Sequence, residues 1–385
     1  MNTRLIFAVL IVLSIKLYSF PLLAEENEDV DEGPQIDFGG ALRFNAFVKN
    51  WEGEENTLLK FGELQFDTWR INADVTHNNF SLSAEYRFYQ GYSFLKHGWI
   101  GYDFSEQTNL KAGIHQVPFG LLPYTAHNWF LMLPYYIGLE DDYNTGLKLR
   151  HRSGNWEFHG AFYKNTPGHF TGSSENSSRY SYDLVADNEE INQGNLRVAY
   201  NLGSNEIGIS GQYGQLFNNR TEEFGHHYAA AAHLDSDIGP FNLKLQALHY
   251  LYDPDEYSGE EGMVTMGAYD FPYQVAAGGE MYTAGLSYKL DVDWGPLSSL
   301  TFYNNFTYFD KADPDFKNSQ MNVAGFMGEM ESIYFYFDAA SGQSHPWIGP
   351  VWSEALARGI GEDPEEDDPE STWATRFNLN VGYYF

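Results

Sequence analysis

Charged residues stand at spacings that could sort ions in a confined space. The run Lys148–Arg152 carries a basic residue at every second position, and a period of two places such residues on one face of a β-strand. Three acids stand side by side at Glu140–Asp142. Fixed charges at close quarters are how pores choose ions. The pattern favours selective passage of solutes over bond-making chemistry.

The same alternation assigns other basic residues to an inward-facing strand surface. They are Arg43, Lys49, Arg70, Arg87, Lys111, Arg197, Lys244, Lys289 and Arg376. Acids on that surface are fewer, because most of the acidic residues of the chain fall in the expected loops and at the N-terminus. A basic wall in so acidic a chain predicts pore-lining roles. The alternative is that a wet interior needs polar residues of any kind and arginine happens to serve.

Catalytic and metal-binding patterns are weak. His227 and His233 share one strand face, but six residues along a strand separate them by about 20 Å, too far for one metal or one dyad. There is no cysteine, which excludes thiol chemistry and cysteine-bound zinc. We predict no catalytic site, no metal and no cofactor, with an enzyme kept as an alternative.

Composition narrows the class of protein. The 385 residues carry a net charge of −31, which excludes a general nucleic-acid binder because phosphate contacts need a basic surface. A mean hydropathy of −0.43 is too polar for a helical membrane bundle. Yet 29 Phe, 28 Tyr and 9 Trp are unlike a disordered acidic chain. Polar, aromatic-rich chains are typical of transmembrane β-barrels.

The first residues read as an export signal. Arg4 precedes the apolar run Leu5–Ile15, and Ala24 precedes an acidic stretch. A basic start, a short apolar core and a small residue mark a secretory signal peptide. We predict residues 1–24 as the signal and 25–385 as one barrel domain, with an uncleaved anchor as the alternative.

Alternation continues along the rest of the chain. Phe80–Tyr89 alternates apolar and polar residues throughout, and Phe377–Phe385 does the same up to the last residue. A change of parity between Phe66 and Trp69 indicates either a bulge or a later strand start. The pattern predicts an all-β, antiparallel transmembrane barrel of about 16 strands, at 36–51, 63–75, 79–90, 95–104, 109–117, 144–152, 156–164, 194–201, 205–214, 225–235, 241–251, 280–290, 298–309, 319–327, 332–340 and 373–385.

Long and short connections alternate between these segments, as external loops and periplasmic turns do in barrels. A barrel of this size has a water-filled lumen. The third external connection, 118–143, is rich in large apolar residues that an exposed loop should not show. We predict that it folds inward, with cover of the rim or of a neighbouring subunit as the alternative.

The expected constriction combines that loop with the basic wall. Its acids, Glu140, Asp141 and Asp142, are predicted to face arginines of the early strands across the waist. The pore-lining set is then Arg43, Arg70, Arg87, Lys111, Lys148, Arg150, Glu140, Asp141 and Asp142. A further acidic run, 362–370, is either a solvated loop or a site for divalent cations.

The stretch Leu110–Tyr124, with its G-x-x-x-x-P-F-G turn and following loop, resembles the phosphate-selective porin O and P superfamily. The resemblance implies a homotrimer of sixteen-stranded channels in the Gram-negative outer membrane. Three acids at the end of the loop depart from the family's basic constriction. We therefore predict an outer-membrane porin for passive diffusion of small hydrophilic or charged solutes, with adhesion or scaffolding as an alternative. Phe385 resembles the terminal aromatic that the barrel-assembly machinery recognises.

Overall fold

The computed structural model describes residues 33–51, 56–168, 179–257, 259–269, 271–359 and 372–385. The chain divides into two units, Met1–Gly33 and Pro34–Phe385, and the account below concerns the second. The predicted signal peptide, 1–24, and the acidic run, 362–370, lie outside the described residues. Within those residues, no helix is long and apolar enough to cross a bilayer.

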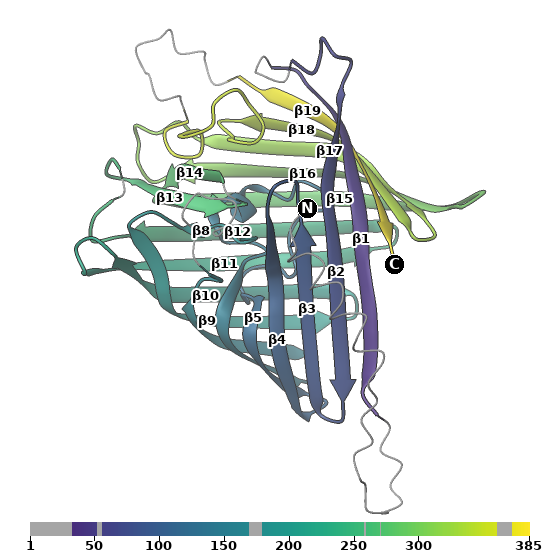
Figure 1. Cartoon of the computed structure of the whole chain (residues 1–385), viewed down its shortest axis with the longest axis horizontal. Helices are drawn as coiled ribbons and strands as arrows, with labels where there is room; N and C mark the ends of the chain where they lie inside the picture. Colours follow the sequence, from purple (N-terminus) through teal and green to yellow (C-terminus); the bar gives the residue numbers. More distant parts are fainter. Residues whose placement is uncertain (1–32, 52–55, 169–178, 258, 270, 360–371) are drawn as a thin grey trace, which may run out of the picture. The chain divides into compact units, whose positions relative to one another are not determined.

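Sixteen antiparallel strands form one closed barrel, in which β1 pairs with β19 (Figure 1). Short turns join the strands at one end, here named the turn end, and longer connections join them at the other, the loop end. The barrel strands are β1 (Gln35–Lys49), β2 (Glu63–His77), β3 (Phe80–Phe88), β4 (Ser93–Ser105), β5 (Thr108–Gln116), β6 (Tyr143–Ser153), β7 (Trp156–Asn165), β9 (Asn188–Leu202), β10 (Asn205–Asn218), β11 (Phe224–Ile238), β12 (Phe241–Asp253), β15 (Gly278–Trp294), β16 (Leu297–Lys311), β17 (Ser319–Met330), β18 (Ile333–Gln343) and β19 (Ala374–Tyr384). All sixteen predicted strands are confirmed.

The two faces of the wall differ as the alternation predicts. Along β19, Phe377 and Leu379 are 46% and 37% exposed, whereas Asn378 and Asn380 are 1% exposed. An apolar outer face suits lipid, and a polar inner face suits a wet or hydrogen-bonded interior. The exposed apolar residues are therefore the lipid-facing side of the barrel.

Two bulges change which side chains point inward. Between β1 and β2, Arg43 is paired with Thr68 and Phe44 with Phe66, which leaves Asp67 as an extra residue. This confirms the bulge that the parity change indicated. Between β3 and β4, Glu85 is paired with His97 and Tyr86 with Leu95, so Lys96 is the extra residue there.

The long connections contain structure that the sequence analysis left as loops. β8 (Asp183–Leu184), β13 (Met263–Ala268) and β14 (Phe271–Ala276) form a separate three-stranded sheet. Val264, Met266 and Val275 of this sheet are at most 1% exposed. The sheet forms because two long connections bury their apolar side chains against each other, a contact that strand-length alternation does not reveal.

The last residue takes part in closing the barrel. The backbone N–H of Gly40 donates to the Phe385 carbonyl at 2.9 Å, and the Phe385 N–H donates to the Gly40 carbonyl at 3.2 Å. A Cβ on Gly40 would lie 2.8 Å from the Phe385 ring. A Cβ there would also lie 2.3 Å from the Arg70 carbonyl oxygen of β2, so both the neighbouring strand and the terminal aromatic require the glycine.

Deletion of Phe385 is expected to lower the yield of heat-modifiable protein in membrane fractions severalfold, because both closing hydrogen bonds and the Phe385 ring beside Gly40 are lost. Export across the inner membrane should be unchanged. Phe385→Trp, which keeps the aromatic and the backbone, is the control. A wild-type yield of heat-modifiable protein from the deletion variant would refute the role.

Candidate functional site

The connection between β5 and β6 is hydrogen-bonded to distant strands. The Gly120 N–H donates to Ser210 Oγ on β10, and the Leu121 N–H donates to Gln246 Oε1 on β12, both at 2.8 Å. Ser210 is 8% exposed beside Ile209 at 63%, so Ser210 belongs to the inner face. The connection therefore reaches inner-face side chains.

Farther along, the same segment reaches strands remote from β5. The His127 N–H donates to Asn305 Oδ1 on β16 at 3.1 Å, and the Trp129 N–H to Asp338 Oδ2 on β18 at 3.4 Å. In the strand order of the closed barrel, β16 is the eighth strand from β5 in either direction. Asn305, in the middle of β16, is fully buried. The segment ties opposite sides of the barrel together.

Apolar side chains of this segment form a core. Met132, Leu133 and Ile137 are fully buried, the last two in the 3₁₀ helix η2 (Leu133–Ile137). They belong to one cluster with apolar residues of β8, β13 and β14. This packing explains why a connection carries so many large apolar residues, since burial removes them from water.

The three acids after η2 are each less than 9% exposed. Glu140 accepts hydrogen bonds from the Thr125 N–H at 3.0 Å and from Thr125 Oγ1 at 2.6 Å. Asp142 accepts from Asn144 Nδ2 at 3.1 Å. Asp141 accepts from the Tyr180 hydroxyl and lies 3.8 Å from Lys96 Nζ.

This arrangement differs from the expected one, in which Glu140, Asp141 and Asp142 face arginines across an open waist. Among the residues described, Asp141 alone of the three has an ion-pair partner, and that partner is Lys96. Period-two parity assigns Lys96 to the lipid side, and the bulge at Lys96 turns it inward instead. A parity change hinted at a bulge only on β2, two strands away from β4, so sequence reasoning missed Lys96.

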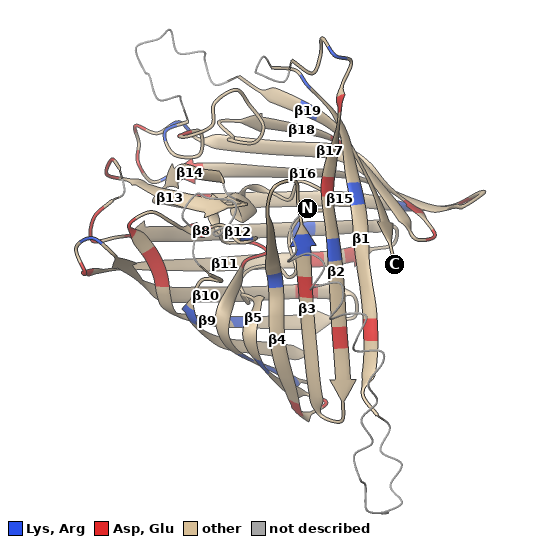
Figure 2. Ribbon diagram, viewed as in Figure 1, with Lys and Arg blue, Asp and Glu red and all other residues tan. Residues whose placement is uncertain are grey.

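The three arginines of the early strands pair with acids of their own wall. Arg43 Nε lies 2.9 Å from Asp67 Oδ2. Glu85 lies 2.5 Å from Arg87 Nε and 3.9 Å from Arg70 Nη1. Figure 2 shows blue and red segments on the neighbouring strands β1, β2 and β3. The charges of this cluster are largely neutralised locally.

Lys111, Lys148 and Arg150 make a second basic group, named here the β5–β6 basic patch. Lys111 and Lys148 are direct partners across the strand pair, and Arg150 follows on the same face. Like charges placed directly opposite are unfavourable. None of the three has a carboxylate within 4.0 Å among the residues described, and Arg150 Nε is buried there without a hydrogen-bond partner. Lys111 Nζ lies 3.4 Å from the Trp99 ring centre. All three side chains are partly exposed.

The two histidines considered as a site lie in different surroundings. His233 Nε2 is 3.1 Å from Glu206 Oε1 and 3.1 Å from Arg197 Nη2. His227 stacks on Tyr252, with ring centres 5.6 Å apart. Each histidine is part of the packing of its own part of the wall.

Burial couples the protonation of Glu140 to the packing of the β5–β6 connection. Desolvation raises the pKa of the Glu140 carboxyl from its ordinary value of 4.5 to about 7, although the Thr125 hydrogen bonds act in the opposite direction. A folded form that holds its proton more tightly loses stability as that proton is withdrawn.

Raising the pH is therefore expected to loosen this connection. The contribution of protonated Glu140 to the free energy of unfolding is fully present below pH 4.5. It falls as the pH rises to about 7, by about 3 kcal/mol at most. Hydrogen-exchange protection of the segment around Thr125 should fall across this range. In Glu140→Gln, which keeps the shape and cannot ionise, the fall in protection with pH should be smaller than in the wild type. Equal pH dependence in both proteins would show that ionisation of Glu140 does not loosen the connection.

Comparisons place the fold among known structures. No protein-family model matches the chain, and no curated protein sequence matches it either. Solved structures do match. The outer membrane channel DcaP of Acinetobacter baumannii has 10% identity and a TM-score of 0.60, over 94% of this chain and 100% of that one.

Two further matches have the same character. The anion-selective porin from Comamonas acidovorans has 10% identity and a TM-score of 0.59, over 91% of this chain and all of that one. Salmonella typhi OmpF, in complex with daunomycin, has 10% identity and a TM-score of 0.56, over 92% and 98%. The chain therefore has the fold of the sixteen-stranded outer-membrane porins and channels. Membership of the phosphate-selective superfamily stays a prediction.

Proposed function

We propose that this protein is an outer-membrane porin, through which small hydrophilic solutes diffuse passively. The observation that carries the proposal is the closed sixteen-stranded barrel, polar inside and apolar outside, with one connection bonded to the far wall. Barrels of this strand number leave an aqueous channel. The porins and channels among the structural matches support this role.

The β5–β6 connection sets the width of the channel in this proposal. A segment that joins β5 to a mid-strand residue of β16 has to cross the lumen, because those strands stand on opposite sides of the barrel. Its apolar core then stiffens the crossing. Narrowing at this level brings the passing solute close to the wall charges.

We expect the channel to prefer anions because, among the residues described, the wall charges without an ion-pair partner include the β5–β6 basic patch. Arg43, Arg70 and Arg87 are paired with acids, and the loop acids are buried. The β5–β6 basic patch has no such partner, so its field acts on the solute.

Liposome swelling tests the proposed diffusion. Vesicles with the refolded barrel should swell in isotonic solutions of small sugars and small organic anions, and swell progressively less as the solute grows. The control is the same protein heat-denatured before reconstitution. If vesicles with the refolded barrel swell no faster than the control vesicles in any of these solutes, the proposed porin function is refuted.

The outer-membrane assembly is proposed to be a homotrimer, since closed symmetry is usual among homo-oligomers. We expect a trimer that survives mild detergent and dissociates on heating. Light scattering in several detergents measures the mass. A monomeric mass in all of them would contradict the trimer.

A further inference from the structure

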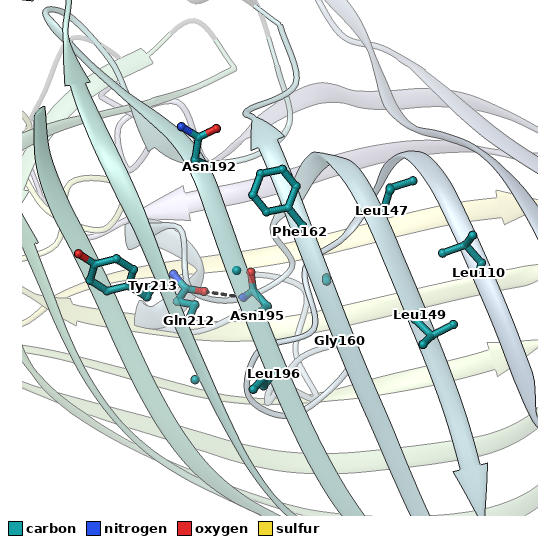
Figure 3. Close-up of a pocket in the computed structure, with 13 residues that line it drawn as sticks. Leu110, Leu147, Leu149, Gly160, Phe162, Asn192, Asn195, Leu196, Gln212 and Tyr213 are labelled. Carbon is teal, nitrogen blue, oxygen red and sulfur yellow. Dashed lines mark hydrogen bonds between the residues drawn. The ribbon is translucent and has the colours of Figure 1, made fainter.

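A groove of about 940 Å³ runs over the outer face of β5, β6, β7, β9 and β10 (Figure 3). Exposed apolar side chains border it, with Leu147 at 51%, Leu196 at 69% and Tyr213 at 59%. Figure 3 shows them along neighbouring strands, with Asn192 towards one end. The groove belongs to the lipid-facing surface, apart from the channel.

Three glycines on neighbouring strands line this groove: Gly160, Gly194 and Gly211. A Cβ added to them would meet its nearest atom at 3.8, 4.0 and 3.8 Å respectively, which is ordinary contact. None of them has a positive φ. The backbone does not require glycine at these positions, and glycine weakens a strand. What the three glycines provide is the hollow itself.

The loop end of the groove carries a cation and an amide. Lys164, at the end of β7, lies on the same strand face as Phe162, and its Nζ donates to Asn192 Oδ1 at 2.6 Å. Asn192 lines the groove and donates to Gln215 Oε1 at 2.8 Å. Lys164 is exposed, and no carboxylate of the described chain lies within 4.0 Å of it. An apolar slot thus ends in an available positive charge.

Fit and charge together select the occupant of such a slot. Lipid tails are as apolar as leucine, so hydrophobicity alone gives no preference within a bilayer. A lysine at the membrane surface attracts anionic headgroups. A phosphorylated lipid meets both requirements, because its acyl chain fills the hollow and its phosphate binds Lys164.

We propose that this groove binds one acyl chain of a phosphorylated lipid from the leaflet at the loop end, with its phosphate on Lys164 and Asn192. The inference rests on the proposed outer-membrane location, where that leaflet holds lipid A, a phosphorylated and multiply acylated sugar lipid. Lipid A is therefore the probe.

Native mass spectrometry of the assembled protein with added lipid A tests the proposal. Gly194→Leu fills the hollow with a residue that the strand accepts, and Lys164→Gln removes the charge. Both variants are expected to lower the bound lipid A, and Lys164→Gln should lower it about fivefold. Lys289→Gln, an exposed lysine near the turn end of β15, is the matched control and should bind as the wild type does. Lipid A stripped of phosphate should bind to the wild type as weakly as lipid A binds to Lys164→Gln.

Wild-type lipid A binding by Gly194→Leu would overturn the proposal. So would a loss of oligomers in Gly194→Leu without loss of lipid, because the groove would then be an interface between copies of the chain. Single-channel conductance is a separate readout and should be unchanged in both groove variants. Absent conductance in the wild type would count against the porin, whatever the lipid result.

Discussion

Replacing residues 119–140 with a short Gly-Ser linker is expected to raise the single-channel conductance at least ~2-fold, because it removes the segment proposed to cross the lumen, and a barrel of this strand number is wide without it. The strands tolerate the change, since Gln116 and Tyr143 are direct partners across β5 and β6 and a short turn can join them. Planar-bilayer recording of the folded variant measures the effect.

The control alters exposed side chains of another connection without changing its length. Leu58 and Leu59, in the connection between β1 and β2, are 57% and 81% exposed, and replacing both with serine should leave the conductance unchanged. Heat-modifiability on gels shows whether each barrel has folded. A folded linker variant with wild-type conductance would show that the segment does not narrow the channel.

Neutralising the β5–β6 basic patch, as Lys111→Gln, Lys148→Gln and Arg150→Gln together, shifts the reversal potential toward cations. A unit charge acts on an ion 4 Å away with about 1 kcal/mol in water, and 1.4 kcal/mol is tenfold. One such charge corresponds to about fivefold, so we expect the anion-to-cation permeability ratio to fall at least ~5-fold at low salt. Above ~0.1 M salt the shift should shrink, as screening shortens the reach of each charge to about 10 Å.

A charge-balanced pair supplies the control for this variant. Arg43 and Asp67 form an ion pair on the wall, so Arg43→Gln with Asp67→Asn removes one charge of each sign. Its reversal potential should stay close to that of the wild type. An unchanged reversal potential in the patch variant at low salt would remove the patch from the selectivity mechanism.

The strands were predictable because two solvents act on them. Lipid on one side and polar groups on the other impose period two, and both β3 and β19 follow it from end to end. The bulge at Asp67 left a trace, because it inverts the parity of β2. The shared strand face of Lys111, Lys148 and Arg150 was predictable from the sequence for the same reason, because regular strands fix which way each side chain points.

The loop contacts were not predictable in this way. Glu140 finds its hydrogen-bond donors in Thr125, within its own connection, and Asp141 meets Tyr180 from another connection. Such contacts depend on how apolar loops pack together, which no local pattern records. Lys96 was missed because a single inserted residue reverses a side chain without changing the composition of the strand.

Single-channel recording of the unmodified protein in planar bilayers at low salt tests the central claim most directly. The account predicts stable, stepwise conductance that is close to proportional to voltage, with a reversal potential in a salt gradient on the side of anions. A folded, heat-modifiable protein that inserts and gives no conductance steps would contradict it.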